Sequence, residues 1–166
     1  MVSLMEVVKV GIADMNVVKA PQSIRTTGLG SCVGVVLYDE TSGIAGLSHV
    51  MLPDSALNKD GAKLNKAKFA DTAIADLRDC LIRSGAIPSL LKAKIAGGAQ
   101  MFQFASQSDV MRIGPRNVEA VKKELQRFNI KLAGEDVGGN NGRTIEFDTE
   151  TSLLHIRTVS KGEAVL

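Results

Sequence analysis

Only two stretches of this sequence have the periodicity of an amphipathic helix, and this scarcity of helices limits the folds open to the chain. Between residues 67 and 84, apolar side chains recur at steps of four, three and four residues, at Ala70, Ile74, Leu77 and Leu81. A second helix is expected to begin near Pro115, a favoured first-turn residue, with one face formed by Val118, Val121, Leu125 and Phe128. Two helices are too few to cover both faces of a large parallel sheet.

The other apolar segments are short, rich in β-branched residues and separated by Gly, Asn or Asp, which is typical of strands. We expect strands within residues 5–14, 32–39, 43–52, 90–102, 130–139, 142–149 and 152–159. The sequence therefore predicts an α/β fold, a layered sandwich of mostly antiparallel or mixed β-sheet with the two main helices on one side. Without an internal repeat or a low-complexity linker, residues 1–166 are expected to form a single domain.

Composition and charge argue against several classes of function. The formal net charge of +2 is too small for the strongly basic surface that nucleic-acid binding usually requires. No apolar run approaches the roughly 18 residues of a membrane span, so no membrane insertion is expected. The N-terminus lacks a basic segment and carries Glu6 among its apolar residues, which favours a cytoplasmic protein without a signal peptide. Two cysteines without a CxxC motif, and only two histidines, argue against a structural zinc site.

The stretch "TTGLGSCVGVVLYD", residues 26–39, places three glycines within seven residues and then becomes apolar. A phosphate-binding glycine loop must open into a helix, whose N-terminus meets the phosphate. Here the residues after Cys32 are strand formers, and no Gly-Lys-Ser/Thr motif is present. The stretch is therefore interpreted as a turn that positions a cysteine rather than as a nucleotide-binding site.

Cys32 becomes more informative together with His49. A cysteine at the start of a strand is usually a small buried hydrophobe, and a histidine on a strand face is usually a core residue. If Tyr38 pairs with Gly43 across the loop "DETS", Cys32 lies directly opposite His49, with Cβ atoms about 4.5–5.5 Å apart. A register shifted by one would instead place Val33 opposite His49. The first register would build a Cys–His dyad.

Such a dyad can act as a nucleophile, because an imidazole can take the proton of a thiol whose pKa is normally near ~8.5. Attack on a carboxamide creates an oxyanion that needs hydrogen-bond donors. The glycine turn around the cysteine can bring backbone N–H groups close to it, and its expected members are Gly28, Gly30, Ser31 and Gly34. A third residue should hold the imidazole, and the hydroxyl of Thr26 or Thr27 could do so.

Two other residues compete for these roles. His155 alternates with Leu153 and Arg157, which suggests a partly solvated strand face and ranks it below His49 as the base. Cys80 lies inside the first helix, beside its apolar face, and structural burial is the expected role.

Several motifs in fixed order resemble the CheD family, the chemoreceptor glutamine deamidases of bacterial chemotaxis. They are "TTGLGSCVGVVLYD", "GLSHVMLP", "KFADTAIADL", "KIAGGAQMF", "IGPRNVEAVKKEL" and "EDVGGNNGRTIEFDTET", and they extend over nearly the whole chain. The resemblance implies that Cys32 is the catalytic cysteine, His49 the histidine and Thr26, rather than Thr27, the threonine. It also implies a layered α/β sandwich similar to that of deamidating bacterial toxins.

The activity implied by the resemblance is hydrolysis of selected glutamine side chains on the helical cytoplasmic region of methyl-accepting receptors, without a metal or organic cofactor. Hydrolysis of glutamate methyl esters is an expected side activity. The implied partner is a CheC-type phosphatase. Independently of the resemblance, Met101 and Phe102 follow a glycine pair at the end of a strand, where they are either core residues or apolar anchors that contact this partner. Two alternatives remain open: a regulatory module that mainly binds receptor or phosphatase with weak catalysis, and a thiol hydrolase of a small amide.

Overall fold

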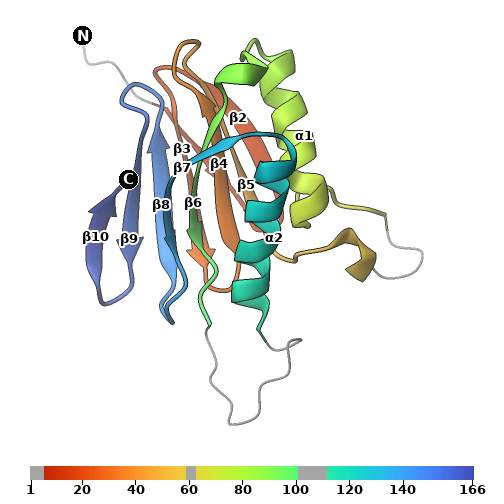
Figure 1. Cartoon of the computed structure of the whole chain (residues 1–166). Helices are drawn as coiled ribbons and strands as arrows, with labels where there is room; N and C mark the ends of the chain where they lie inside the picture. Colours follow the sequence, from red (N-terminus) through yellow and green to blue (C-terminus); the bar gives the residue numbers. More distant parts are fainter. Residues whose placement is uncertain (1–5, 59–62, 101–111) are drawn as a thin grey trace.

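The chain forms three layers: one layer of helices, a central sheet, and an outer sheet (Figure 1). This computed structural model describes residues 6–58, 63–100 and 112–166. The two sheets pack face to face, and both main helices cover the free face of the central sheet. The predicted α/β sandwich is confirmed. Among the described residues, no helix combines the length and the apolar character needed to cross a membrane.

The outer sheet has five strands in the order β1-β3-β8-β9-β10. Its β1–β3 pair is parallel and its other pairs are antiparallel. The bounds are β1 Val7–Val10, β3 Ser23–Leu29, β8 Arg143–Asp148, β9 Leu153–Thr158 and β10 Gly162–Val165.

The central sheet also has five strands, in the order β2-β5-β4-β6-β7, and only its β6–β7 pair is parallel. The bounds are β2 Met15–Lys19, β4 Val33–Asp39, β5 Ile44–Val50, β6 Lys92–Gly97 and β7 Lys131–Val137. All residues of β4 and β5 are buried because these strands are covered on both faces, by helices on one side and by the outer sheet on the other.

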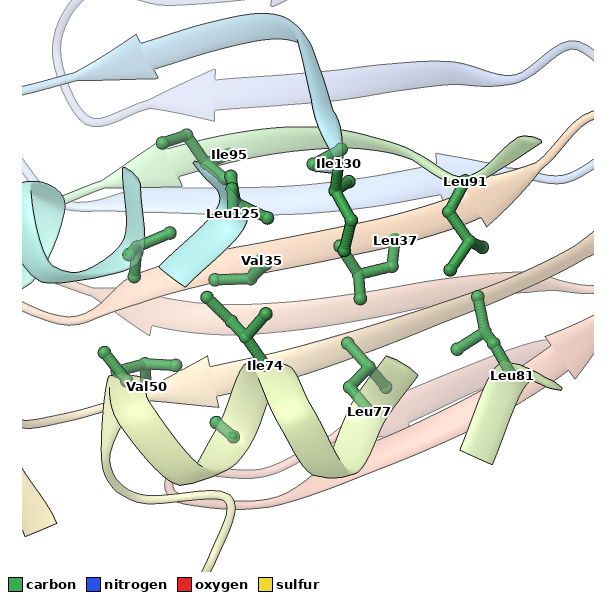
Figure 2. Close-up of a cluster of buried hydrophobic side chains, with 14 of the residues drawn as sticks. Val35, Leu37, Val50, Ile74, Leu77, Leu81, Leu91, Ile95, Leu125 and Ile130 are labelled. Atoms are coloured by element: carbon green, nitrogen blue, oxygen red, sulfur yellow. The ribbon is translucent and has the colours of Figure 1, made fainter. Parts of the chain in front are cut away.

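Helices α1, Ala70–Arg83, and α2, Ile113–Arg127, lie side by side on the central sheet. The apolar faces predicted from their periodicity are the faces that pack: Ile74 and Leu77 of α1 face Val35 and Leu37 of the sheet, and Leu81 faces Leu91 (Figure 2). Two short 3-10 helices, Ser55–Leu57 and Pro88–Leu90, precede α1 and β6. A second apolar core fills the space between the two sheets, where Val36, Leu47, Ile145, Phe147 and Leu154 are buried.

Three strands were not predicted. One strand is expected within residues 5–14, but β1 ends at Val10 and a turn follows, after which β2 begins at Met15 and joins the other sheet. Ala13 has a positive φ of 57°, which ends the extended conformation there. The strand β3 was missed because its Ser, Thr and Gly residues resemble a turn, and β10 because it is short and exposed.

The predicted register between β4 and β5 is wrong by two residues. Tyr38 pairs with Ala45 and Asp39 with Ile44, so the residue opposite His49 is Gly34. Gly43 is not a strand residue: its φ of +70° closes the turn, and its N–H donates to the Asp39 carbonyl at 3.1 Å. A shift by two residues preserves the face on which each side chain lies.

Candidate active site

His49 and Thr26 meet between the two sheets. His49 lies on β5 of the central sheet and Thr26 on β3 of the outer sheet, and both are buried. The distance between His49 Nδ1 and Thr26 Oγ1 is 2.8 Å. This hydrogen bond joins the two sheets across the inter-sheet core, so the packing of the layers fixes the orientation of the imidazole.

The Thr26 hydroxyl decides which ring nitrogen of His49 carries the proton. Thr26 donates its hydroxyl hydrogen to the carbonyl oxygen of Val10, on the neighbouring strand β1, at 2.8 Å. A hydroxyl has only one hydrogen to donate, so the same oxygen can only accept from His49. Nδ1 therefore carries the ring hydrogen and Nε2 carries the lone pair. Nε2 is buried and makes no hydrogen bond to any residue that the structure describes, which leaves it able to accept a proton.

Cys32 lies directly before β4 and is half-buried, with its side chain packed against the same inter-sheet core that His49 faces. Because Gly34 is opposite His49, Cys32 is the diagonal neighbour of His49 along this face. Such diagonal positions are about 7–8 Å apart in an antiparallel pair, and an imidazole ring spans much of that distance. The thiol and the ring therefore share one face, as predicted, although in a different register.

Burial favours the neutral form of both groups. Burial raises the pKa of the Cys32 thiol, and hydrogen bonding from its own backbone N–H lowers that pKa to a smaller extent. Burial lowers the pKa of the His49 imidazole. At neutral pH the resting site therefore holds a protonated thiol and an uncharged imidazole with its lone pair on Nε2. Proton transfer would accompany attack on a substrate rather than precede it.

The loop that carries the thiol is held from one side by backbone and side-chain donors. The carbonyl oxygens of residues 30–32 accept hydrogen bonds at 2.8, 3.0 and 2.8 Å, from Ala99 N, Asn117 Nδ2 and Gly98 N respectively. These donors lie just after β6 and in α2. The end of β6 lies so close to this loop that position 97 requires glycine. A Cβ on Gly97, whose φ is +113°, would overlap the carbonyl oxygen of Cys32.

Because these carbonyls point toward β6 and α2, two backbone N–H groups of the same loop point in the opposite direction. In a planar trans peptide the C=O and the N–H point in opposite directions, so the N–H groups of Ser31 and Cys32 point away from β6 and α2. Apart from the contact of Cys32 N–H with its own thiol, neither group donates to another described residue. Two such donors beside a nucleophile can bind an oxyanion.

The glycines predicted for this turn have different roles. Gly28 has a φ of +72°, and its carbonyl accepts the N–H of Gly30 at 3.1 Å, so the Gly30 N–H is already used. Gly34 lies inside β4, where a Cβ would come within 2.6 Å of Ile145 Cδ1. Gly34 therefore lets the two sheets pack closely next to His49, and it is not part of the turn.

The competing residues lie outside this cluster. Thr27 is exposed because it points to the opposite face of β3 from Thr26. His155 is exposed on β9, in agreement with the solvated face expected for it. Cys80 is only half-buried, contrary to the expectation of structural burial, and its Sγ accepts a hydrogen bond from Arg83 Nη2 at 3.3 Å. Met101 and Phe102 lie outside the described residues.

One polar residue near the thiol was not singled out from the sequence. Asn117 is fully buried and also donates to the carbonyl of Met51, two residues after His49, at 2.9 Å. A polar residue four positions before Val121 interrupts the apolar face of α2, and this interruption was the available signal. Within the described ranges, no group of three or more His, Cys, Asp or Glu side chains is arranged to hold a metal ion.

An α/β sandwich with a half-buried thiol, an oriented imidazole and a hydroxyl beside one inter-sheet core has the side chains that cysteine hydrolases use. Comparison with known proteins narrows this class. Residues 51–158 match the family model described as CheD chemotactic sensory transduction, and the chain belongs to the CheD family.

Curated relatives agree with this assignment over nearly the whole chain. The chain is 62% identical to the chemoreceptor glutamine deamidase CheD of Halalkalibacterium halodurans, over 95% of this chain and 97% of the relative. It is 56% identical to the protein of the same name from Bacillus subtilis, over 96% of each. A probable chemoreceptor glutamine deamidase CheD from Syntrophomonas wolfei is 47% identical, over 97% of this chain and 99% of the relative.

Proposed function

We propose that this protein is a cysteine-dependent glutamine deamidase that converts selected glutamine side chains of chemotaxis receptors to glutamate. The names of its curated relatives support the reaction and the class of substrate. The observation that carries the proposal is the state of His49: its Nδ1–H donates to Thr26, and its Nε2, on the face shared with Cys32, has no hydrogen-bond partner among the described residues. A neutral imidazole in this tautomer is the form that a general base requires.

In the first half of the reaction, His49 Nε2 takes the thiol proton as Cys32 Sγ attacks Cδ of the glutamine carboxamide. The carbonyl oxygen becomes an oxyanion, which the N–H groups of Ser31 and Cys32 stabilise. The Thr26 oxygen accepts from Nδ1–H of the imidazolium that has formed. His49 then donates its proton to the departing nitrogen. The C–N bond breaks, ammonia leaves, and a thioester joins Cys32 to the substrate.

In the second half, His49 takes a proton from water, and the resulting hydroxide attacks the thioester carbonyl at the same oxyanion site. The C–S bond breaks and Cys32 regains its proton from His49. The balance is one carboxamide and one water consumed, one carboxylic acid and one ammonia formed. A glutamate methyl ester would follow the same path with methanol as the leaving group, which supports the proposed methylesterase side activity.

We also propose a CheC-type phosphatase as a protein partner, on the basis of membership in the CheD family. The alternative function is a binding module with weak catalysis. The alternative predicts stable complexes with a receptor fragment or the phosphatase, together with turnover that is barely above the uncatalysed rate. Measuring binding and turnover on the same preparation distinguishes the two.

The decisive experiment incubates the purified protein with a purified cytoplasmic receptor fragment, then measures released ammonia and locates new glutamates by peptide mass spectrometry. Wild type and Cys80→Ala are expected to be active, and Cys32→Ala inactive. A Cys32→Ala protein that is folded and still active would refute the proposed nucleophile. Turnover of free glutamine but not of the fragment would instead favour a small-amide hydrolase.

A further inference from the structure

Asn117 connects the two segments that carry the proposed nucleophile and base. Its Nδ2 donates to the carbonyl of Ser31, next to Cys32, at 3.0 Å, and to the carbonyl of Met51, beyond the end of β5, at 2.9 Å. An amide nitrogen has two hydrogens, so each carbonyl receives one. A flipped amide would direct Oδ1 at two carbonyl oxygens, so this hydrogen-bond network determines the orientation of the side chain.

The position of Asn117 is fixed by the packing of α2. Three residues earlier, Gly114 contacts the backbone after β6 so closely that a Cβ would overlap the Ala99 carbonyl oxygen. That same segment holds the carbonyls of Gly30 and Cys32. The first turns of α2 and the end of β6 thus form one rigid support for the thiol loop, and Asn117 extends this support to β5.

Only one end of the Asn117 amide forms hydrogen bonds to residues that the structure describes. Asn117 is fully buried, and its Oδ1 has no hydrogen-bond partner among the described residues. A buried acceptor without a partner is unfavourable; an apolar residue on this face of α2 would remove it, but would also leave the carbonyls of Ser31 and Met51 without this donor. Asn117 therefore lies in the core, yet its side chain acts as a hydrogen-bond donor to the segments that contain Ser31 and Met51.

We propose that Asn117 is a positioning residue for the reaction at Cys32, an inference that rests on the proposed function. By holding the Ser31 carbonyl, it orients the peptide between Ser31 and Cys32, so that the Cys32 N–H points to the place where the oxyanion forms. By holding the Met51 carbonyl at the same time, it fixes the spacing between this N–H and the strand that carries His49.

The two parts of the site can be separated experimentally. Deamidation requires both a thiolate and an oxyanion hole, whereas alkylation by iodoacetamide is a displacement at saturated carbon that requires only the thiolate. The test measures kcat, KM and the alkylation rate of Cys32 in a Cys80→Ala background. Asn117→Ala is expected to lower kcat by about 100-fold, within the range for loss of one oxyanion donor, with KM unchanged and alkylation nearly unchanged. His49→Ala should lower both rates.

A matched control is Ser48→Ala. Ser48 is fully buried beside His49 on β5 and donates to the carbonyl of Ala67 at 3.3 Å, on the helix side of the strand. Its substitution should lower the unfolding temperature without changing kcat or alkylation. If Asn117→Ala does not fold, Asn117→Ser, which keeps a single donor, is expected to show the same selective loss of kcat to a smaller extent.

Equal kcat in folded Asn117→Ala and wild type, or a proportional loss of kcat and alkylation, would overturn the positioning role. A loss confined to KM would also overturn it. Absence of ammonia release by the wild type would refute the proposed function instead, so the two failures are distinguishable.

Discussion

Replacing Thr26 by valine removes one hydroxyl without changing the volume of the side chain, and it tests how His49 is oriented. Thr26 is 2% exposed and its oxygen makes two hydrogen bonds of 2.8 Å, one to Val10 and one to His49. Valine leaves the buried ring N–H without this partner, whereas the Val10 carbonyl keeps its place in the β1–β3 ladder. At about 1–3 kcal/mol for one unsatisfied buried group, the free energy of unfolding should fall by about 1–3 kcal/mol.

The catalytic effect follows from the charge that His49 acquires during the reaction. A hydrogen bond to a charged group contributes about 1.5–3 kcal/mol, compared with about 1 for a neutral one, so the bond from Nδ1–H strengthens as the imidazolium forms. Without the hydroxyl, the imidazole can also adopt the tautomer that places the hydrogen on Nε2, which cannot act as a base. The difference of about 0.5–2 kcal/mol, at 1.36 kcal/mol for each factor of ten, corresponds to a fall in kcat of about 2- to 30-fold, and the inactive tautomer adds to this loss.

The assay is ammonia release from a receptor fragment at saturating concentration, at a temperature where circular dichroism shows the variant to be folded. Thr27→Val is the matched control, because Thr27 is the exposed neighbour on the opposite face of β3 and should be close to wild type. Thr26→Ser keeps the hydroxyl and should recover most of the activity. Full activity of Thr26→Val, or a larger loss in Thr27→Val, would refute the assignment of the threonine.

Three further predictions concern the thiol and the imidazole. Brief iodoacetamide treatment of the native protein should label Cys32 before Cys80, and preferential labelling of Cys80 would count against the nucleophile assignment. His49→Ala should abolish deamidation in a folded protein whereas His155→Ala should not, and equal losses would mean that the wrong base has been chosen. Because burial lowers the pKa of His49, kcat/KM should fall toward acid with a midpoint below the usual histidine value of about 6.5, whereas a midpoint above 6.5 would contradict the lowered pKa. Histidine in the unfolded chain has its usual pKa of about 6.5 and therefore takes up a proton at a higher pH than folded His49 does. The free energy of unfolding should thus decrease as the pH falls below about 6.5. His49→Ala should flatten this pH dependence, measured by urea unfolding at a series of pH values.

The sequence determined the elements whose pattern is local. The helical periodicity around Ile74 and Val121 predicted both helices and the faces that they bury, because one turn of helix brings these positions together whatever surrounds them. The register assumed between β4 and β5 also placed Cys32 and His49 on one face, which a shift by one residue would not have done. That result survived a wrong register because a shift of two residues leaves each side chain on its face.

Tertiary structure decided what depends on contacts between distant segments. The register between β4 and β5 depends on the left-handed conformation of Gly43, which the residue types of the turn do not specify uniquely. The contact of Thr26 with His49 exists only because two different sheets pack together at this point, and no spacing within one strand encodes that packing. From the residues alone, Thr26 and Thr27 were equally suitable. Family resemblance favoured Thr26, and the buried face of β3 supplies the physical reason. The two carbonyls held by Asn117 come from segments 86 and 66 residues away in sequence, so only the folded chain could bring them to one amide.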